Sequence, residues 1–259
     1  PSTALQQSDL QFDSPYSNFS LSFDGTTSVS MDFTNTSNKG SVSVWVKPTD
    51  YATGQQVIWC YNGSGNRDYI GLFQLTSGVL GFETADNGAN KWRVVTTSAA
   101  VSNNTWTHLL CTFDGSNAII YANGIAVPQS YTHSSDTTWW WDNLIPTNQR
   151  LGILNVSGYG IGQQYNGSMD ENVVWNTNLT EAQVLEIYNN GRPKDLTTFS
   201  GTAPINWWRL GENAYFDNNS FVVPNSITGA PNGTGSGSIT SMISADAPGT
   251  YANGIGTNL

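Results

Sequence analysis

Hydrophobic and polar residues alternate over short stretches along most of the chain, as they do in β-strands with one buried face. Val29, Met31 and Phe33 follow this pattern, and so do the valines of the segment SVSVWVKP at 41–48. The pair Asn123-Gly124 separates two apolar runs, which predicts a two-residue hairpin with a type I′ turn. The pattern therefore predicts an all-β fold.

One segment, residues 178–191, has helical periodicity instead. Thr180 is suited to the N-cap, Glu181 places a carboxylate in the first turn, and Gly191 is suited to end the helix. The apolar residues at helical spacing are Val184, Leu185, Ile187 and Tyr188. We expect one short helix, which follows a strand with a buried centre at 168–175.

Two segments depart from the alternation. Residues 128–147 form a polar stretch around three consecutive tryptophans, Trp139–Trp141, and we expect a loop there. Beyond Gly191 the chain continues through the apolar segment Ile205–Leu210 and several turn-rich stretches to Leu259. This part reads as an extension that packs against the main fold or against a neighbouring subunit.

Charged residues make up only 11% of the chain, and the net charge is −10. Serine, threonine, asparagine and glycine supply the polarity instead, which is typical of a β-fold with many polar turns. Because no basic patch is present, we expect no nucleic-acid binding. Because no apolar run approaches membrane-spanning length, we expect no membrane insertion.

The two cysteines, Cys60 and Cys111, both lie in apolar strand segments. Two buried free thiols are the simplest interpretation, since free cysteine is among the most buried residue types. A disulfide between them stays open as an alternative, because it depends on how closely the two Cα atoms approach.

Four segments carry a resemblance to a known family: Phe19–Val29, Ser41–Pro48, Trp106–Val127 and Gly167–Gly191. Together they resemble laminin-G-like jelly-roll domains of the concanavalin A-like lectin/glucanase superfamily. The resemblance implies an all-β, two-sheet antiparallel jelly-roll sandwich with one short C-terminal helix over residues 16–192. Residues 1–15 would then be an N-terminal arm and residues 193–259 the extended tail.

The motif Trp-Trp-Arg-Leu-Gly at 207–211 resembles laminin-G-like proteins of marine bacteriophages. This resemblance implies a non-catalytic structural or adhesion module on a phage virion, as a capsid decoration or a tail appendage. Its partners would be other virion subunits or surface glycans, with a homo-oligomer as one form of assembly. The alternative is a secreted carbohydrate-binding lectin, so the expected location is the virion surface or the extracellular space.

The resemblance also implies a structural calcium site. The superfamily often holds a calcium ion where an aspartate of the closing strand meets a loop carbonyl, and Asp170 matches that aspartate. Gly40 is the candidate carbonyl donor and Asp24 a further candidate carboxylate, since Ca²⁺ prefers such oxygen ligands. Glu171 is expected to point to the opposite strand face. In the alternative, Asp170 and Asp24 accept backbone hydrogen bonds at turns.

A carbohydrate or partner contact is the second candidate site. Trp139, Trp140 and Trp141 offer aromatic faces, Asp142 and Asn143 offer hydrogen bonds, and Trp92 lies in another loop that could join them. The alternative is that these tryptophans anchor the loop internally or bury against a subunit, because tryptophan is enriched at interface hot spots.

Glycoside hydrolysis is the third candidate, and it requires two carboxyl groups facing one substrate. The superfamily's glucanases carry them at alternate positions of one strand, and no such run occurs here. Glu83 and Asp86 lie in or near a loop, and Asp170 and Glu171 are adjacent. We therefore expect no enzyme, and we expect His108 to be structural.

Overall fold

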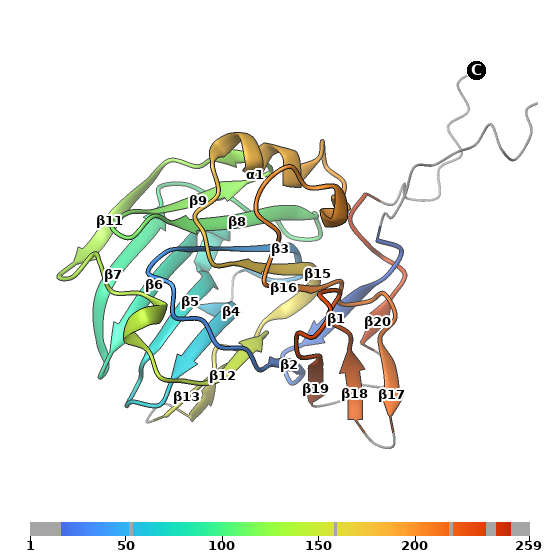
Figure 1. Cartoon of the computed structure of the whole chain (residues 1–259), viewed down its shortest axis with the longest axis horizontal. Helices are drawn as coiled ribbons and strands as arrows, with labels where there is room; N and C mark the ends of the chain where they lie inside the picture. Colours follow the sequence, from blue (N-terminus) through green and yellow to red (C-terminus); the bar gives the residue numbers. More distant parts are fainter. Residues whose placement is uncertain (1–16, 52–53, 158–159, 218–219, 237–241, 250–259) are drawn as a thin grey trace, which may run out of the picture.

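The computed structural model describes residues 17–51, 54–157, 160–217, 220–236 and 242–249 (Figure 1). Two antiparallel sheets pack face to face, as the alternation and the family resemblance predicted. The predicted arm at 1–15 lies outside the described residues.

Sheet A has β3 and β15 at its centre. Its strands in spatial order are β10 (Ile125–Ala126), β9 (Ala118–Ala122), β8 (Thr107–Phe113), β3 (Gly40–Pro48), β15 (Asn166–Trp175), β1 (Ser20–Asp24) and β20 (Ile243–Ser244), with β16 (Asn206–Trp208) also paired to β15. Val42, Val44 and Val46 point from β3 into the space between the sheets and are fully buried. The predicted hairpin joins β9 to β10, with φ values of +50° at Asn123 and +80° at Gly124.

Sheet B has more strands than sheet A, and the strand at one of its edges, β11, was not predicted from the sequence. Its order is β11 (Gln129–Ser134), β7 (Ala89–Thr96), β6 (Leu80–Asp86), β5 (Tyr69–Gln74), β4 (Gln56–Gly63), β12 (Pro146–Leu151), β2 (Ser28–Met31), β19 (Gly233–Ser236), β18 (Ser220–Val223) and β17 (Tyr215–Asp217). The strand β11 lies in the stretch expected to be a loop, and its residues are almost all exposed. It therefore carries no hydrophobic alternation. The short pair β13 (Leu154–Val156) and β14 (Gly160–Gly162) forms a separate ribbon.

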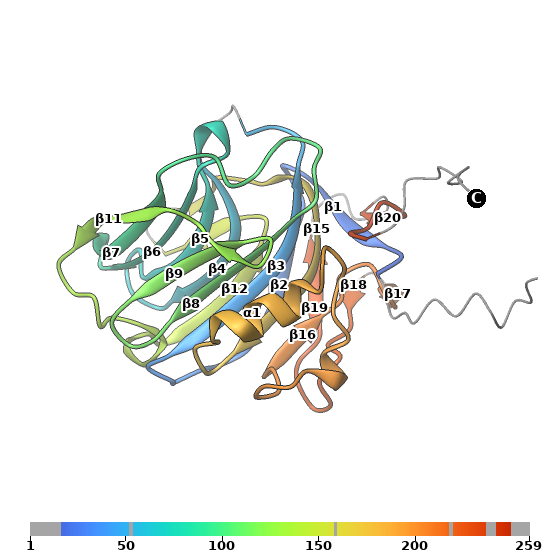
Figure 2. The same ribbon diagram turned by 90° about the horizontal axis from the view of Figure 1, so that it is seen from above.

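The helix α1 (Glu181–Tyr188) lies across the outer face of sheet A, so both faces of this sheet are covered (Figure 2). The Thr180 hydroxyl accepts a hydrogen bond from the backbone N–H of Gln183, which confirms the predicted N-cap. Val184 and Ile187 pack on Trp175 and its neighbours. The helix ends at Tyr188, because Asn189 adopts the left-handed conformation that the sequence predicted for Gly191.

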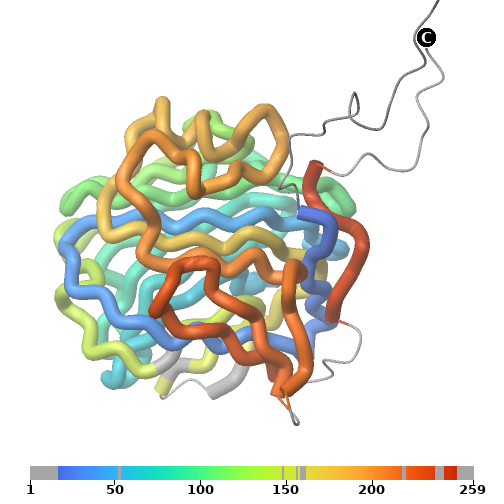
Figure 3. The backbone as a smooth tube through the Cα atoms, turned by 45° about the vertical axis from the view of Figure 1, so that its right-hand side comes forward, coloured from blue at the N-terminus to red at the C-terminus, as the bar shows by residue number. Residues whose placement is uncertain are grey.

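The described part of the extension adds strands to both sheets. The strand β16 pairs with β15, β20 pairs with β1, and β19 joins the β18–β17 hairpin to β2. Figure 3 shows this orange and red segment running alongside the blue N-terminal strands. The extension is thus packed on its own sandwich. Within the described ranges, no helix has the length and apolar content needed to cross a membrane.

Candidate functional site

A cleft of about 540 Å³ opens where the sandwich meets the extension. One wall comes from the chain that follows β2, from the start of β12 and from the residue after β15. The other wall comes from the extension, at the start of β16 and just before β19. The lining residues are Asp32, Phe33, Thr34, Asn35, Thr36, Pro146, Thr147, Gln149, Asn176, Ile205, Asn206, Ala230 and Pro231.

Buried hydrogen bonds fix the floor of the cleft. The backbone N–H of Asn35 donates to the Tyr61 hydroxyl at 3.0 Å, and the backbone N–H of Phe33 donates to Oε1 of Gln149 at 3.1 Å. Tyr61 and Gln149 come from β4 and β12 and are nearly inaccessible to solvent. The polar residues at the floor are therefore held by the core rather than by a free loop.

Asn35 lines this cleft and carries a buried donor without a partner. Its Oδ1 accepts the backbone N–H of Ser37 at 2.9 Å, whereas its buried Nδ2 has no hydrogen-bond partner within the described residues. The residue is only 7% exposed. A buried amide without a partner is costly, so such a group points to a ligand that accepts its hydrogen bond.

Hydrogen bonds also hold the wall that the extension supplies. Oδ1 of Asn206 accepts a hydrogen bond from Nδ2 of Asn225 at 2.9 Å, and Oδ1 of Asn225 accepts the backbone N–H of Trp207 at 3.1 Å. The fully buried indole of Trp208 donates to the Pro231 carbonyl at 3.2 Å. This wall therefore depends on the docking of the extension against β15.

The cleft has few charges. Asp32 is the only ionisable residue among those that line it. Its other polar groups are the amides and hydroxyls of asparagine, glutamine and threonine. Such a lining suits a neutral ligand rich in hydroxyl groups.

The structure places the predicted tryptophans in the core. Trp140 and Trp141 are fully buried, Trp139 is 6% exposed, and Trp92 donates from its indole to the Trp139 carbonyl at 3.0 Å. The ring of Trp140 stacks on that of Phe113 with a centroid distance of 4.4 Å. These rings have no free face for a sugar, which corrects the surface-site expectation and favours internal packing.

Asp142 and Asn143, beside these tryptophans, are both exposed. Oδ1 of Asn143 accepts the backbone N–H of Trp140 at 3.1 Å, and so Asn143 serves the turn. Neither residue lines the cleft. The predicted loop thus divides into a buried aromatic part and two polar residues at the surface.

The three residues predicted to hold calcium do not come together. Asp24 pairs with Asn166 at one end of β1, whereas Asp170 lies beyond the Leu21–Met169 pair at the other end. Gly40 pairs with Phe113, whereas Asp170 pairs with Trp45 further along β3. Oδ1 of Asp24 accepts hydrogen bonds from Thr26 and Thr27, as in the turn alternative, and they lower its pKa.

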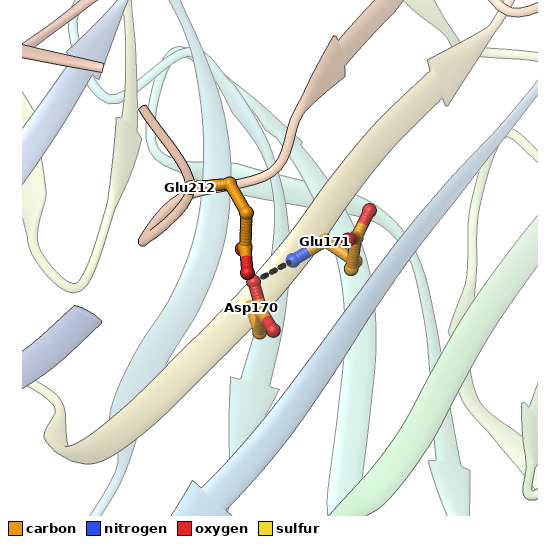
Figure 4. Close-up of side chains that lie close together, drawn as sticks. All are labelled: Asp170, Glu171 and Glu212. Atoms are coloured by element: carbon orange, nitrogen blue, oxygen red, sulfur yellow. Dashed lines mark hydrogen bonds between the residues drawn. The ribbon is translucent and has the colours of Figure 1, made fainter. Parts of the chain in front are cut away.

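Asp170 belongs to a different acidic group, with Glu171 and Glu212 (Figure 4). One carboxylate oxygen of each residue lies within 4.8 Å of the others. The strand is bulged between Asp170 and Val173, and Glu171 has a φ of +48°. This bulge explains why two adjacent carboxylates approach each other, contrary to the expectation that they face opposite ways.

Burial raises the pKa of both strand carboxyls. The pKa of Asp170 is raised well above its usual range by loss of solvation and by the nearby Glu171 carboxylate. The pKa of Glu171 is raised to about 7 by burial, although Arg209 and the Trp207 indole counteract the shift. Nε of Arg209 lies 2.9 Å from one oxygen of Glu171.

The other candidate acids are engaged in ion pairs. Glu83 accepts a hydrogen bond from the Tyr69 hydroxyl and pairs with Arg93 at 2.8 Å, and burial raises its pKa. Asp86 pairs with Lys91 at 2.9 Å. The expectation of a non-catalytic chain stays a prediction.

His108 lies on the outer face of sheet A beneath α1. Its Nε2 is 2.7 Å from the Ser43 hydroxyl, and its ring lies against those of Trp45 and Tyr188. Burial lowers the pKa of His108 to about 3, so the ring is neutral over the ordinary pH range. These contacts fit the expected structural role.

Both cysteines are buried free thiols, which confirms the simpler interpretation. Burial raises the pKa of Cys60 to about 12 and raises that of Cys111 even further. Neither thiol is therefore a reactive nucleophile at neutral pH.

The two packed antiparallel sheets, the covering helix and the polar cleft define a lectin-like β-sandwich. The family model described as "Concanavalin A-like lectin/glucanases superfamily" matches residues 23–185. The chain belongs to this superfamily. No curated protein sequence matches it.

Solved structures show the same fold at low sequence identity. A candidate carbohydrate-binding protein from Bacteroides ovatus is 20% identical with a TM-score of 0.64, and the match covers 90% of this chain and 61% of that one. The heptameric SAP-like pentraxin of Limulus polyphemus is 17% identical with a TM-score of 0.52, over 84% of this chain and 95% of the other. The CBM40 of a Ruminococcus gnavus sialidase, bound to α2,3 sialyllactose, is 16% identical with a TM-score of 0.52, over 67% and 99%.

Proposed function

We propose that this chain is a non-catalytic carbohydrate-binding module whose site is the cleft between the sandwich and the extension. The observation that carries the proposal is the buried Nδ2 of Asn35, which faces no protein acceptor within the described residues. A rotation of the Asn35 amide toward the cleft would let a sugar hydroxyl accept this hydrogen bond and donate to a neighbouring oxygen at the same time. The structural relatives named for carbohydrate binding support the proposal.

The ligand we expect is a neutral oligosaccharide. The lining residues include no lysine or arginine, so the carboxylate of an acidic sugar would have no cationic partner there and would be repelled by Asp32. Phe33 is the only aromatic residue in the lining, and it is 7% exposed. Binding thus rests on hydrogen bonds more than on stacking.

The test is a panel of neutral oligosaccharides, with α2,3-sialyllactose as the acidic probe, followed by calorimetry on the best ligand. Asn35→Asp keeps the oxygen that accepts the Ser37 N–H but removes the donor. We expect at least a tenfold weaker affinity, or about 1.4 kcal/mol, measured well below the Tm of the variant, which the buried carboxylate oxygen should also lower. Asp142→Asn, outside the cleft, is the control. Equal affinity of Asn35→Asp and the native chain would refute the site.

We further propose that the module is displayed on a virion or another extracellular surface, where it contacts glycans or subunits. This proposal rests on the phage resemblance of the Trp-Trp-Arg-Leu-Gly motif at 207–211. Light scattering of the purified chain measures its oligomeric state, and mass spectrometry of purified virions detects it as a component. A monomer with no affinity for virions would contradict the assembly role.

A further inference from the structure

One arginine on the outer face of sheet B has no counter-ion. Arg150 lies in β12 between the buried residues Gln149 and Leu151, so its side chain points away from the core. The residue is half-buried, and its Nε is buried without a hydrogen-bond partner among the described residues. Burial dominates the pKa of the Cys60 thiol, but the charge of Arg150 opposes that rise, which places the guanidinium group beside Cys60 of β4.

The missing counter-ion is not due to a shortage of acids. The chain has 19 acidic residues against nine lysines and arginines, so carboxylates are in excess. Several other cations form ion pairs within the described ranges: Lys47, Lys91, Arg93, Lys194 and Arg209. Arg150 forms no ion pair and no side-chain hydrogen bond with any residue that the structure describes. A half-buried guanidinium group has lost part of its hydration, so an anion that supplies the missing partner gains a strong contact.

Two hydroxyl groups lie in line with Arg150. In the sheet register, Arg150 is opposite Ser30 of β2, and Ser30 is opposite Thr234 of β19 (Figure 1). Residues directly opposite each other in antiparallel strands share a face, so the three side chains form one row with steps of roughly 5 Å. Ser30 is half-buried and Thr234 is exposed, and neither hydroxyl has a hydrogen-bond partner in the described part of the chain. The row thus combines one cation with two unused hydroxyls.

The surroundings of the row come from two different parts of the chain. On one side, Leu154 of β13 packs on Cys60, so the β13–β14 ribbon covers the outer face of β4 next to Arg150. On the other side, the extension adds β19 to β2 and supplies Thr234. The family model ends at residue 185, so β19 lies outside the matched residues. The row is therefore a feature of this chain with its extension and not of the sandwich alone.

We propose that Arg150, Ser30 and Thr234 form a second binding site, which takes the carboxylate group of an acidic saccharide. The outer nitrogens of a guanidinium group can hold a carboxylate through two parallel hydrogen bonds. The two hydroxyls, one and two strands away, can bond to hydroxyl groups of the attached sugar ring. A singly charged group is favoured, because the net charge of −10 opposes more highly charged anions. The site is separate from the cleft, whose lining includes no arginine.

The first experiment titrates glucuronate, glucose and acetate into the ¹⁵N-labelled full chain at pH 7 and constant ionic strength. NMR follows the Nε–H signal of Arg150, which is assigned by its absence in Arg150→Gln. Glucose is the matched neutral probe, since it has a hydroxymethyl group in place of the carboxylate. We expect a saturating shift with glucuronate and at least tenfold weaker binding of glucose and of acetate at this signal. No shift with glucuronate, or equal binding of glucose, would overturn the site, and equal binding of acetate would overturn its assignment to a saccharide.

The second experiment compares variants through the backbone amide signals of Ser30 and Thr234. Arg150→Gln should bind glucuronate at least tenfold more weakly, whereas Lys39→Gln, the same charge change at an exposed lysine, should bind like the native chain. Thr234→Val keeps the shape of an exposed side chain, so its Tm should not change while glucuronate binding weakens several-fold. Equal affinity in Arg150→Gln and Lys39→Gln would overturn the proposal. Asn35→Asp separates the two sites: it should leave glucuronate binding unchanged, and a loss there would place the ligand in the cleft and refute the second site.

Discussion

Replacement of Trp140 by alanine separates the two roles that the sequence left open for the tryptophan loop. A surface sugar site predicts lost binding with an unchanged Tm, whereas the buried position predicts the reverse. The side chain is fully inaccessible, and its ring contacts those of Phe113, Trp141, Phe82 and Trp92.

The magnitude follows from the buried area. Truncation of a buried tryptophan to alanine removes about 150 Å² of apolar surface, which at roughly 25 cal/mol per Å² is worth about 4 kcal/mol. The indole N–H of Trp140 has no partner among the described residues, and its removal returns about 1 kcal/mol. We therefore expect a loss of about 3 kcal/mol, close to the usual range for such a truncation.

For a domain of this size, that loss lowers Tm by about 6–12 °C. Differential scanning calorimetry measures the shift, and urea unfolding followed by near-UV circular dichroism measures the free energy. Phe216→Ala is the control, because this aromatic side chain is 51% exposed and should cost under about 1 kcal/mol. A Tm within 2 °C of the native value, together with lost sugar binding, would refute the reasoning.

Two further predictions concern stability. A Cβ on Gly40 would lie 1.9 Å from Cζ3 of Trp141, so Gly40→Ala should cost about 1–3 kcal/mol, measured by urea unfolding; an unchanged midpoint would contradict this contact. His108 has its pKa lowered to about 3, and Glu171 and Lys194 are the charged groups that border its cavity. As the pH falls below about 6.5, the unfolded chain gains a proton that His108 excludes in the folded chain, so the contribution of His108 to stability decreases by about 2 kcal/mol at pH 5, whereas Glu171, whose pKa is raised to about 7, contributes in the opposite direction. His108→Gln should remove this contribution, so that its Tm at pH 5, relative to its Tm at pH 7, lies above that of the native chain. The control His133→Gln, at an exposed position of β11, should behave like the native chain.

Much of the fold follows from local sequence. The alternation of the valines in β3, the Asn123-Gly124 turn and the Thr180 cap each act over a few residues, and each appears in the structure as predicted. The local pattern also explains why the sequence predicted a loop where the structure has the strand β11. Residues 129–134 are polar on both faces, and only pairing with β7 makes them a strand.

The position of the tryptophans was decided by tertiary structure. Three consecutive aromatic residues in a polar segment are equally compatible with an exposed site and with a buried anchor. Trp141 is buried because Gly40, a hundred residues away in the chain, leaves space for its ring. No signal near Trp141 reveals this packing.

The sequence by itself determined the all-β class, the family and the single helix, because these depend on periodicity and on short-range turn and cap chemistry. Tertiary structure alone decided the candidate sites. The cleft joins Asn35 to Asn206, and the acidic group joins Asp170 to Glu212, through strands that pair across most of the chain. The bulge at Glu171 reversed the expected direction of its side chain, since strand alternation holds only where the ladder is regular.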